Sequence, residues 1–307
     1  MSGLTVLAVD LGKTSCRVRL SRGDAVLGES TDEGAPGLAD EHGQDLARRA
    51  VLGSVAGLSP DVQPLLAGLD GIGIGAAGAL AAPDAVRGLV RELRADFDAP
   101  VAVISDGLSA HVGAFAGGAG TVLIAGTGAV VFTLDDGGPI RQIDGLGPWL
   151  GDEGSGRWIG QQGLQAALRA DDGRGPATTL RAAAAGVAGG LAALPGWVSA
   201  AGTPARTIGT FAPTVITHAS DGDGAARAIV AQACALLALT CAAARPSTGR
   251  VCVTGGLVSH PYFRTALGDA LTDAGLALIS PLGDALAGAT LIAHCRALPH
   301  EKRITRG

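Results

Sequence analysis

The sequence predicts an α/β fold built from two related halves. Apolar, strand-like runs alternate with amphipathic helical segments along the chain. A strand–turn–strand pattern with a glycine-containing turn occurs at residues 4–20 and again at 121–134, and a long helical region follows the second copy. A chain of 307 residues is also long for a single hydrophobic core. We therefore expect two α/β domains, the second enlarged by helices.

The first hundred residues predict a strand meander followed by a strand between two helices. Residues 15–20 alternate apolar and charged side chains, and residues 41–58 repeat apolar positions near a period of 3.6. The glycines in the strand within residues 68–80 allow close backbone approach. In order, the predicted elements are strands at 4–9, 15–20 and 25–28, a helix over 41–58, the strand within 68–80, and a helix over 84–95.

The rest of the chain repeats this plan with more helix. A buried strand at 101–104 ends on Asp106, and a second buried strand at 121–125 breaks into a glycine turn. The remaining predicted elements are strands at 129–134 and 140–143, a helical region over 155–245, a strand at 250–254, a helix over 259–274, and a strand before a last helix from residue 284.

Composition and charge exclude several classes of protein. The net charge is −5 and Lys and Arg do not cluster, which argues against a nucleic-acid surface. The one basic group, Lys302, Arg303 and Arg306, is expected to be a solvated tail. No start resembling a signal peptide and no apolar run suited to a bilayer is found. The five cysteines form no C-x-x-C pair, which disfavours zinc, iron–sulfur and disulfide sites and indicates a reducing cytoplasm.

A D-x-G-x-T turn follows the first strand and contains Asp10, Gly12, Lys13 and Thr14. Such a turn can offer backbone amides and a hydroxyl to phosphate oxygens, while the Asp orients Mg²⁺ through a water molecule. An ordinary hairpin turn is the alternative reading of this short pattern.

A second glycine turn and a carboxylate strengthen the phosphate-binding reading. A buried strand is followed by Gly126, Thr127 and Gly128. These residues form either an ordinary hairpin turn or a second phosphate-binding turn. Asp106 follows another strand, where an Asp is either a helix N-cap or a general base. Two such turns with a carboxylate between them favour phosphoryl transfer from a nucleotide.

The string G-P-W-L-G-D-E-G-S-G-R-W-I-G, residues 147–160, is the most specific in the chain. Asp152 and Glu153 lie between glycines just before a helix, and glycine costs conformational entropy that an ordinary surface loop does not need. We expect Ser155 to cap the helix, Trp158 to pack in the core, and the two carboxylates to bind sugar hydroxyls or backbone amides. Further on, Gly255 and Gly256 end a strand in V-T-G-G, which fits an adenosine cradle or a plain strand-to-helix connection.

Together, D-L-G-K-T-S, I-S-D-G-L-S-A, I-A-G-T-G, the G-D-E-G-S-G-x-W-I-G string and V-T-G-G resemble the N-acetylglucosamine kinase group of the BadF/BadG-type ATPases, in the actin/hexokinase superfamily. The resemblance covers nearly the whole chain in the right order. It implies two ribonuclease-H-like domains around a central cleft, at residues 1–105 plus 285–307 and at 106–284, with ATP and Mg²⁺ bound and a sugar 6-hydroxyl as the phosphoryl acceptor.

Residue by residue, the resemblance implies Asp106 as general base and acceptor contact, and Asp10 as the residue that holds Mg²⁺ through water. Nucleotide contacts fall on Asp10, Gly12, Lys13, Thr14, Gly126, Thr127, Gly128, Gly255 and Gly256. Sugar contacts fall on Gly78, Asp106, Trp149, Asp152 and Glu153. A homodimer in the cytoplasm, with no membrane or nucleic-acid partner, is the implied assembly.

The chain departs from the family pattern near the sugar. The usual G-T-G-S-N reads G-T-G-A-V, so Ala129 and Val130 replace a polar pair. The usual G-W-G has Leu146 in place of tryptophan, which appears instead at Trp149, and Leu38 lies in the loop that often supplies an Asn. The sequence therefore supports phosphoryl transfer more strongly than it supports N-acetylglucosamine or glucosamine as the substrate. An ATPase that acts on a protein partner and a non-catalytic sugar sensor are the alternative functions.

Overall fold

The computed structural model describes residues 3–200, 203–244 and 247–307, so Arg245, the end of the predicted helical region, lies outside it. The chain divides into two compact units. Unit 1 contains the chain up to Ala119, Asp136–Gly138 and Pro281–Gly307, and unit 2 contains Gly120–Asp135 and Pro139–Ser280. The division follows Ala119 rather than residue 105, so the helix that begins at Asp106 belongs to unit 1.

Unit 1 contains a six-stranded sheet in the order β11-β5-β4-β1-β2-β3. Strands β1, β2 and β3 form an antiparallel meander, and β4 and β5 run parallel to β1. The third strand is longer than the predicted 25–28, because it pairs with β2 up to the register Ser15↔Glu33. The strands are β1 (Thr5–Leu11), β2 (Ser15–Arg22), β3 (Ala25–Glu33), β4 (Gly71–Ala76), β5 (Val101–Ser105) and β11 (Thr305–Arg306).

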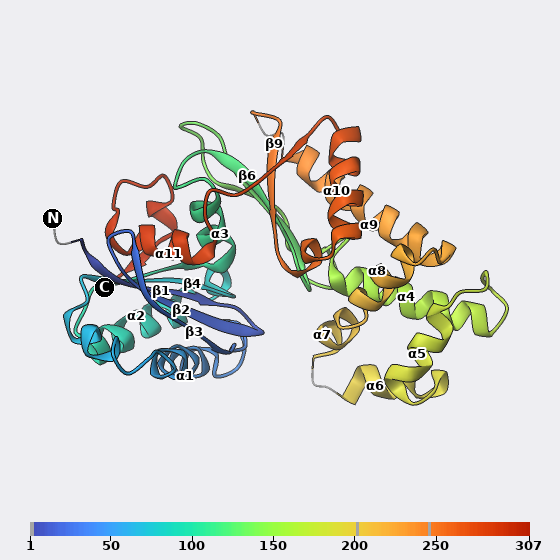
Figure 1. The fold of residues 1–307 in the computed structure, drawn as a ribbon, viewed down its shortest axis with the longest axis horizontal. Helices are drawn as coiled ribbons and strands as arrows, with labels where there is room; N and C mark the ends of the chain where they lie inside the picture. The colour runs from blue at the N-terminus through green and yellow to red at the C-terminus, as the bar shows by residue number, and fades with distance from the viewer. Residues whose placement is uncertain (1–2, 201–202, 245–246) are drawn as a thin grey trace. The chain divides into compact units, whose positions relative to one another are not determined.

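Helices cover both faces of this sheet (Figure 1), with α1 and α2 on one face and α3 and α11 on the other. They are α1 (Gly43–Ala56), α2 (Pro83–Phe97), α3 (Asp106–Ala114) and α11 (Ala285–His294). As predicted, glycine in β4 allows close backbone approach, because a Cβ atom at Gly73 would overlap the carbonyl oxygen of Ala289 in α11. Helix α11 therefore packs directly on the backbone of the central strand.

The predicted solvated tail is wrong for Arg306. Strand β11 pairs with β5, and Gly307 exchanges backbone hydrogen bonds with Val101. The guanidinium of Arg306 is largely buried, forms an ion pair with Glu301 at 2.6 Å, and donates to the carbonyl oxygens of Ile292 and Cys295. These bonds attach the C-terminal segment to α11 and to the edge of the sheet.

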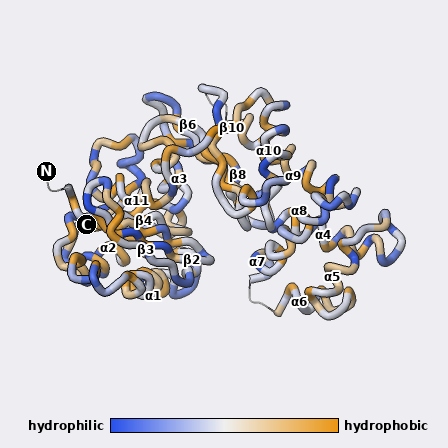
Figure 2. The backbone as a smooth tube through the Cα atoms, in the orientation of Figure 1, coloured by the Kyte–Doolittle hydropathy of each residue, from blue (hydrophilic) through white to orange (hydrophobic). Residues whose placement is uncertain are grey.

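Unit 2 repeats the strand order of unit 1. Its five-stranded sheet runs β10-β9-β6-β7-β8, so an antiparallel meander (β6, β7, β8) is again joined by two parallel strands. Strand β6 is strongly hydrophobic (Figure 2), as expected for the central strand of a sheet. The strands are β6 (Gly120–Ala125), β7 (Ala129–Leu134), β8 (Arg141–Asp144), β9 (Arg250–Thr254) and β10 (Ala277–Ile279).

The helices of unit 2 lie almost entirely between its third and fourth strands. In unit 1 the same connection, from β3 to β4, contains α1 as its one α-helix, whereas from β8 to β9 the structure describes α4 to α9. They are α4 (Gly156–Asp171), α5 (Leu180–Ala188), α6 (Leu194–Ala200), α7 (Pro204–Gly209), α8 (Ala212–Ser220) and α9 (Gly224–Ala243), and α10 (Pro261–Asp273) follows β9. Short 3₁₀ helices occur at Gln63–Gly68, Ala79–Ala81, Leu191–Ala193, Gly256–Ser259 and Glu301–Arg303.

Helix α9 is apolar and long enough to cross a membrane, as is the bent pair of helical segments Leu180–Ala188 and Leu191–Ala200 if it is counted as one span. In unit 2, α9 contributes Val230, Ala233, Leu237 and Cys241 to the hydrophobic core, together with Phe211, the N-cap residue of α8, and Phe263 of α10. Its apolar character is thus that of a core helix.

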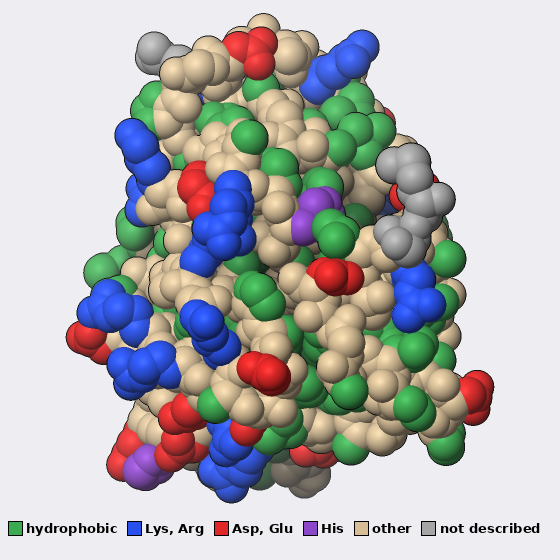
Figure 3. Space-filling model, turned by 90° about the vertical axis from the view of Figure 1, so that its left-hand side faces the viewer, with side chains coloured by type: hydrophobic (Ala, Val, Ile, Leu, Met, Phe, Trp, Pro, Cys, Tyr) green, Lys and Arg blue, Asp and Glu red, His purple; other side chains and the backbone are tan. Residues whose placement is uncertain are grey.

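Charges of both signs mix on the protein surface. Figure 3 shows Lys and Arg beside Asp and Glu across one face of the molecule. Several charged side chains of unit 1 are paired, for example Arg48 with Asp96 through two hydrogen bonds of 2.6 and 2.7 Å. Exposed pairs of this kind add little to stability but keep the surface potential mixed.

Candidate active site

The carboxyl ends of three neighbouring parallel strands bring the predicted residues of unit 1 together. Asp10 on β1 is opposite Gly75 on β4, and Ala76 is opposite Ser105 on β5, directly before Asp106. A Cβ atom at Gly75 would lie 3.4 Å from the Cα atom of Asp106. Ligands of open α/β sheets bind outside this edge.

Asp106 does not cap its helix. Ser105 is the N-cap of α3, and its hydroxyl accepts the backbone N–H of Leu108 at 3.2 Å. The Asp106 carboxylate accepts the N–H of Gly107 at 2.9 Å. Burial raises the pKa of Asp106 above its ordinary value, and the negative charge of Asp10 raises it further. The hydrogen bond from Gly107 lowers the pKa, but by less than burial raises it. The structure therefore removes the capping alternative and leaves a carboxyl of raised proton affinity.

Asp10 is held by an arginine that the sequence analysis did not single out. Oδ2 of Asp10 accepts from Nη2 of Arg17 at 2.6 Å and from its Nε at 3.1 Å. Arg17 also lies 3.5 Å from Asp284, the N-cap of α11, which Arg19 approaches at 3.4 Å. The only sequence signal was the position of Arg17 on the polar face of β2, opposite Asp10.

The first glycine turn is supported by the end of the meander. Gly12 donates to the carbonyl oxygen of Ser15 at 3.0 Å, and Gly34 donates to that of Thr14 at 3.1 Å. The ammonium group of Lys13 is exposed and lies 3.7 Å from Asp40. The D-x-G-x-T segment is thus a tight turn at the same edge as Asp106.

Gly78 and Leu38 are neighbours in unit 1. Gly78 has a φ of +79°, and a Cβ atom there would lie 2.8 Å from the backbone nitrogen of Leu38. Leu38 in turn donates to Ala77 at 2.9 Å, and its side chain is buried. Leu38 therefore contributes to the core, and the segment after β4 is fixed against the loop at residues 35–38.

In unit 2 the second glycine turn is attached to the start of α4. Gly126 donates to Gly128 at 2.9 Å, Gly156 donates to the carbonyl oxygen of Gly126 at 2.8 Å, and Arg157 donates to that of Thr127 at 3.0 Å. As predicted, Ser155 caps α4 by accepting from the N–H of Trp158 at 3.2 Å.

The V-T-G-G segment lies beside this turn. Strands β6 and β9 are parallel with Ile124 opposite Thr254, so both glycine segments leave the same edge of the sheet. Gly255 has a φ of +108°, and a Cβ atom there would overlap the carbonyl oxygen of Ala125. Gly256 begins the 3₁₀ helix Gly256–Ser259.

Asp144, which the sequence analysis missed, organises the loop that contains Asp152 and Glu153. Its Oδ1 accepts the backbone N–H of Asp152 at 2.9 Å, and its Oδ2 accepts that of Glu153 at 3.1 Å. Asp144 and Asp152 both have left-handed φ values, 58° and 56°. Because such angles are unfavourable for residues other than glycine, Asn and Asp, the hydrogen bonds and the conformation support each other.

Asp152 faces backbone amides of unit 2. A Cβ atom at Gly128 would lie 2.9 Å from Oδ2 of Asp152, so this glycine permits close approach of the carboxylate to the turn. Burial raises the pKa of Asp152, and so does Asp144, while the N–H groups of Ala129 and Gly147 and the charge of Arg157 lower it. Asp152 thereby connects the glycine turn with the loop at 145–154.

The other predicted sugar contacts are exposed. Trp149 has an exposed fraction of 79%, and Glu153 is exposed as well. Leu146, which replaces the usual tryptophan, is 67% exposed. Ala129 is buried at the start of β7. The side chain of Val130 lies close to Gly145, since a Cβ atom at Gly145 would be 2.7 Å from it. Val130 therefore packs against the loop, and Ala129 belongs to the hydrophobic core of unit 2.

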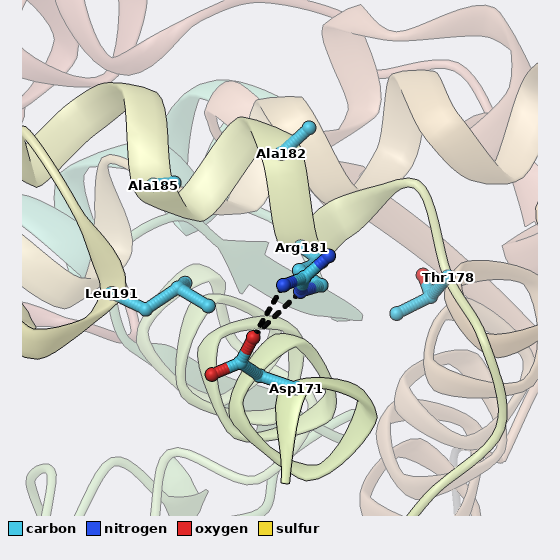
Figure 4. Close-up of a pocket in the computed structure, with 6 residues that line it drawn as sticks. All are labelled: Asp171, Thr178, Arg181, Ala182, Ala185 and Leu191. Carbon is cyan, nitrogen blue, oxygen red and sulfur yellow. Dashed lines mark hydrogen bonds and ion pairs between the residues drawn. The ribbon is translucent and has the colours of Figure 1, made fainter. Parts of the chain in front are cut away.

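A cavity of about 550 Å³ lies elsewhere in unit 2, among α4, α5 and the 3₁₀ helix Leu191–Ala193 (Figure 4). An ion pair of 2.6 Å joins Arg181 to Asp171 at its wall. None of the predicted site residues lines it; the lining residues are Asp171, Thr178, Arg181, Ala182, Ala185 and Leu191.

Several solved structures resemble this chain over nearly its whole length. A Chromobacterium violaceum protein provisionally assigned as an N-acetylglucosamine kinase is 27% identical, with a TM-score of 0.78 over 94% of this chain and 99% of its own. A Porphyromonas gingivalis protein with the same provisional assignment is 20% identical, with a TM-score of 0.76 over 97% and 99%.

A ROK-family glucokinase from Streptomyces griseus, solved with glucose and AMPPNP, is 19% identical with a TM-score of 0.59 over 94% and 99%. These likenesses confirm the predicted actin/hexokinase-type fold. No curated protein sequence matches the chain.

The sequence also matches a family model over residues 7–293, which include both glycine turns, Asp106 and the loop organised by Asp144. This match, over most of the chain, places it in the BadF/BadG/BcrA/BcrD ATPase family.

Proposed function

We propose that the chain is an ATP-dependent sugar kinase that phosphorylates the 6-hydroxyl of an amino sugar, N-acetylglucosamine or glucosamine. The observation that carries the proposal is the environment of Asp106. Ser105 caps helix α3, so Asp106 does not, and burial raises the pKa of the Asp106 carboxyl. A general base works best when its pKa approaches the operating pH, and Asp106 follows the strand beside the Asp10 turn.

Asp106 accepts the hydroxyl proton of the sugar as the oxygen attacks the γ-phosphorus atom, the bond from this atom to the β,γ-bridging oxygen breaks, and ADP leaves. The turns at Gly12–Thr14 and Gly126–Gly128 bind phosphate oxygens through backbone N–H groups, and Gly255 and Gly256 border the adenosine. Asp152, Glu153, Trp149 and Gly78 contact the acceptor. The similarity to provisionally assigned N-acetylglucosamine kinases supports this choice of acceptor.

The carboxylate of Asp10 fits a hydrated Mg²⁺. Oδ2 accepts both hydrogen bonds from Arg17, which leaves Oδ1 to accept from a metal-bound water. One protein carboxylate is sufficient, since Mg²⁺ keeps several waters and is otherwise held by substrate phosphates. When bound, the ion supplies positive charge to the phosphates. We also propose that the protein acts in the cytoplasm as a homodimer.

The test is ADP release measured with glucosamine, N-acetylglucosamine, glucose, N-acetylmannosamine and N-acetylmuramic acid, for the wild type and for Asp106→Asn. We expect sugar-dependent ADP release, and a kcat lower in the variant by about 10² to 10⁴ while ATP binding stays within about twofold. Asp98→Asn is the matched control, because Asp98 is exposed at the end of α2 in the same unit.

Full activity of Asp106→Asn would refute the assignment of the base. ADP release that no sugar stimulates would refute the kinase and favour an ATPase that acts on a protein partner. Sugar binding without any turnover would favour the sensor.

A further inference from the structure

Arg157, in the first turn of α4, carries a buried charge that forms no ion pair with a carboxylate in the part of the chain that the structure describes. The residue is 8% exposed, and no carboxylate oxygen lies within 4.0 Å of its guanidinium among residues 3–200, 203–244 and 247–307. Its Nε is buried and has no hydrogen-bond partner in the same part of the chain. Burying a cation in this way is unfavourable, so its contacts need an explanation.

The contacts of Arg157 join two parts of the candidate site. Its backbone N–H donates to Thr127 in the glycine turn at 3.0 Å. Its side chain reaches the other way, from Nη2 to the carbonyl oxygen of Gly151 at 3.1 Å and from Nη1 to Oε1 of Gln161 at 2.6 Å. Gly151 directly precedes Asp152, whose carboxylate lies against Gly128.

We propose that Arg157 is a positioning residue, which fixes the loop at 145–154, and with it Asp152, against the glycine turn for binding of the acceptor. The inference rests on the proposed function for its kinetic part only. The flat guanidinium suits this task, because it can donate to Gly151 and Gln161 at once, while a lysine ammonium reaches one of them.

The charge of Arg157 adds to the geometric effect. Asp152 is partly buried beside Asp144, and both conditions favour protonation of its carboxyl, while Arg157 opposes protonation. Without the arginine, Asp152 would bind a proton at higher pH, and the neutral carboxyl would accept less strongly from the N–H groups of Ala129 and Gly147. Both connections between the loop and the turn would then be weaker.

The first experiment needs no substrate. Hydrogen exchange of the Asp152 and Glu153 amides, which donate to Asp144, is measured in the wild type, Arg157→Met, Arg157→Lys and Arg169→Met. We expect exchange at least tenfold faster in Arg157→Met and an intermediate rate in Arg157→Lys. Arg169, exposed at the far end of α4, is the matched control and should leave the exchange unchanged.

The second experiment uses the kinase assay between pH 5 and 8. Arg157→Met should raise the KM for the sugar at least tenfold, leave the KM for ATP within twofold, and move the acid limb of the sugar KM profile to higher pH. Arg157→Lys retains the charge, so it should raise the KM while keeping the wild-type pH profile. If Arg157→Met does not fold, the role of Arg157 is decided by Arg157→Lys, from the amide hydrogen exchange of Asp152 and Glu153 and from the KM for the sugar.

Wild-type exchange in both Arg157 variants would overturn the inference. Equal rises in both KM values, a lower Tm and an unchanged pH profile would also overturn it, because they would show a purely structural residue. A wild type that phosphorylates no sugar would refute the proposed function instead, and the exchange experiment would still decide the role of Arg157 in the loop.

Discussion

His300 is expected to make unit 1 sensitive to acid. It is fully buried, and its Nε2 lies 3.0 Å from Nδ1 of His111 on α3, the helix that starts at Asp106. Burial lowers the pKa of His300 from 6.5 to about 4, and the neighbouring His111 lowers it as well. A buried imidazole of this kind stays neutral in the folded protein at pH values where the unfolded chain is already protonated.

The sign and size of the effect follow from these two pKa values. Well above pH 6.5 His300 is neutral in both states and its contribution to stability is complete. As the pH falls towards 4, only the unfolded state binds the proton, so stability is lost across this window. Between pH 7 and pH 5 the loss is about 1.8 kcal/mol, which for a unit of about 150 residues lowers Tm by roughly 5 °C.

The assay compares urea unfolding of the wild type with His300→Gln from pH 7 to pH 5, followed by circular dichroism. Glutamine keeps hydrogen-bonding groups but does not titrate, so the difference in unfolding free energy between the two proteins should shrink by about 1.8 kcal/mol. His294→Gln is the control, because His294 is exposed at the end of α11. A difference that stays constant over this pH range would refute the reasoning.

Three further predictions concern unit 2. Gly255→Ala should destabilise the protein by about 1–3 kcal/mol and weaken ATP binding in calorimetry, because the new methyl group meets Ala125 at a positive φ. Asp223→Ala should cost about 1–2 kcal/mol in thermal unfolding at pH 7, since Asp223 caps α9; an unchanged Tm would contradict this. Asp144→Ala should speed amide exchange at Glu153 and raise the KM for the sugar. Equal exchange in the wild type and the variant would show that the loop keeps its conformation without Asp144.

Much of the fold follows from local patterns. The apolar runs and glycine turns predicted both meanders, because the central strands of each sheet are buried on both faces and their sequences are almost continuously apolar. The edge-of-sheet position of Asp10 and Asp106 follows in the same way, since each comes at the end of such a run.

The missed features depend on contacts between distant residues. Strand β11 has two residues, too few for any periodicity, and forms because β5 offers an unpaired edge. Asp144 accepts hydrogen bonds from amides eight and nine positions further along, across a loop with several left-handed residues. A local sequence pattern does not predict such contacts. The choice of Ser105 rather than Asp106 as the cap depends on the backbone angles at the end of β5.

The matching strand order of the two sheets has a consequence for engineering and for descent. One repeat accommodates a single α-helix between its third and fourth strands and the other accommodates α4 to α9, while each sheet keeps the same order of its five core strands. A duplicated ancestor could thus lengthen this one connection in one copy without disturbing the strand ends that carry Asp10, Asp106 and the glycine turns. In the corresponding connection of unit 1, the exposed turn at residues 59–61, after α1, is where we would graft a foreign helical module or a reporter domain.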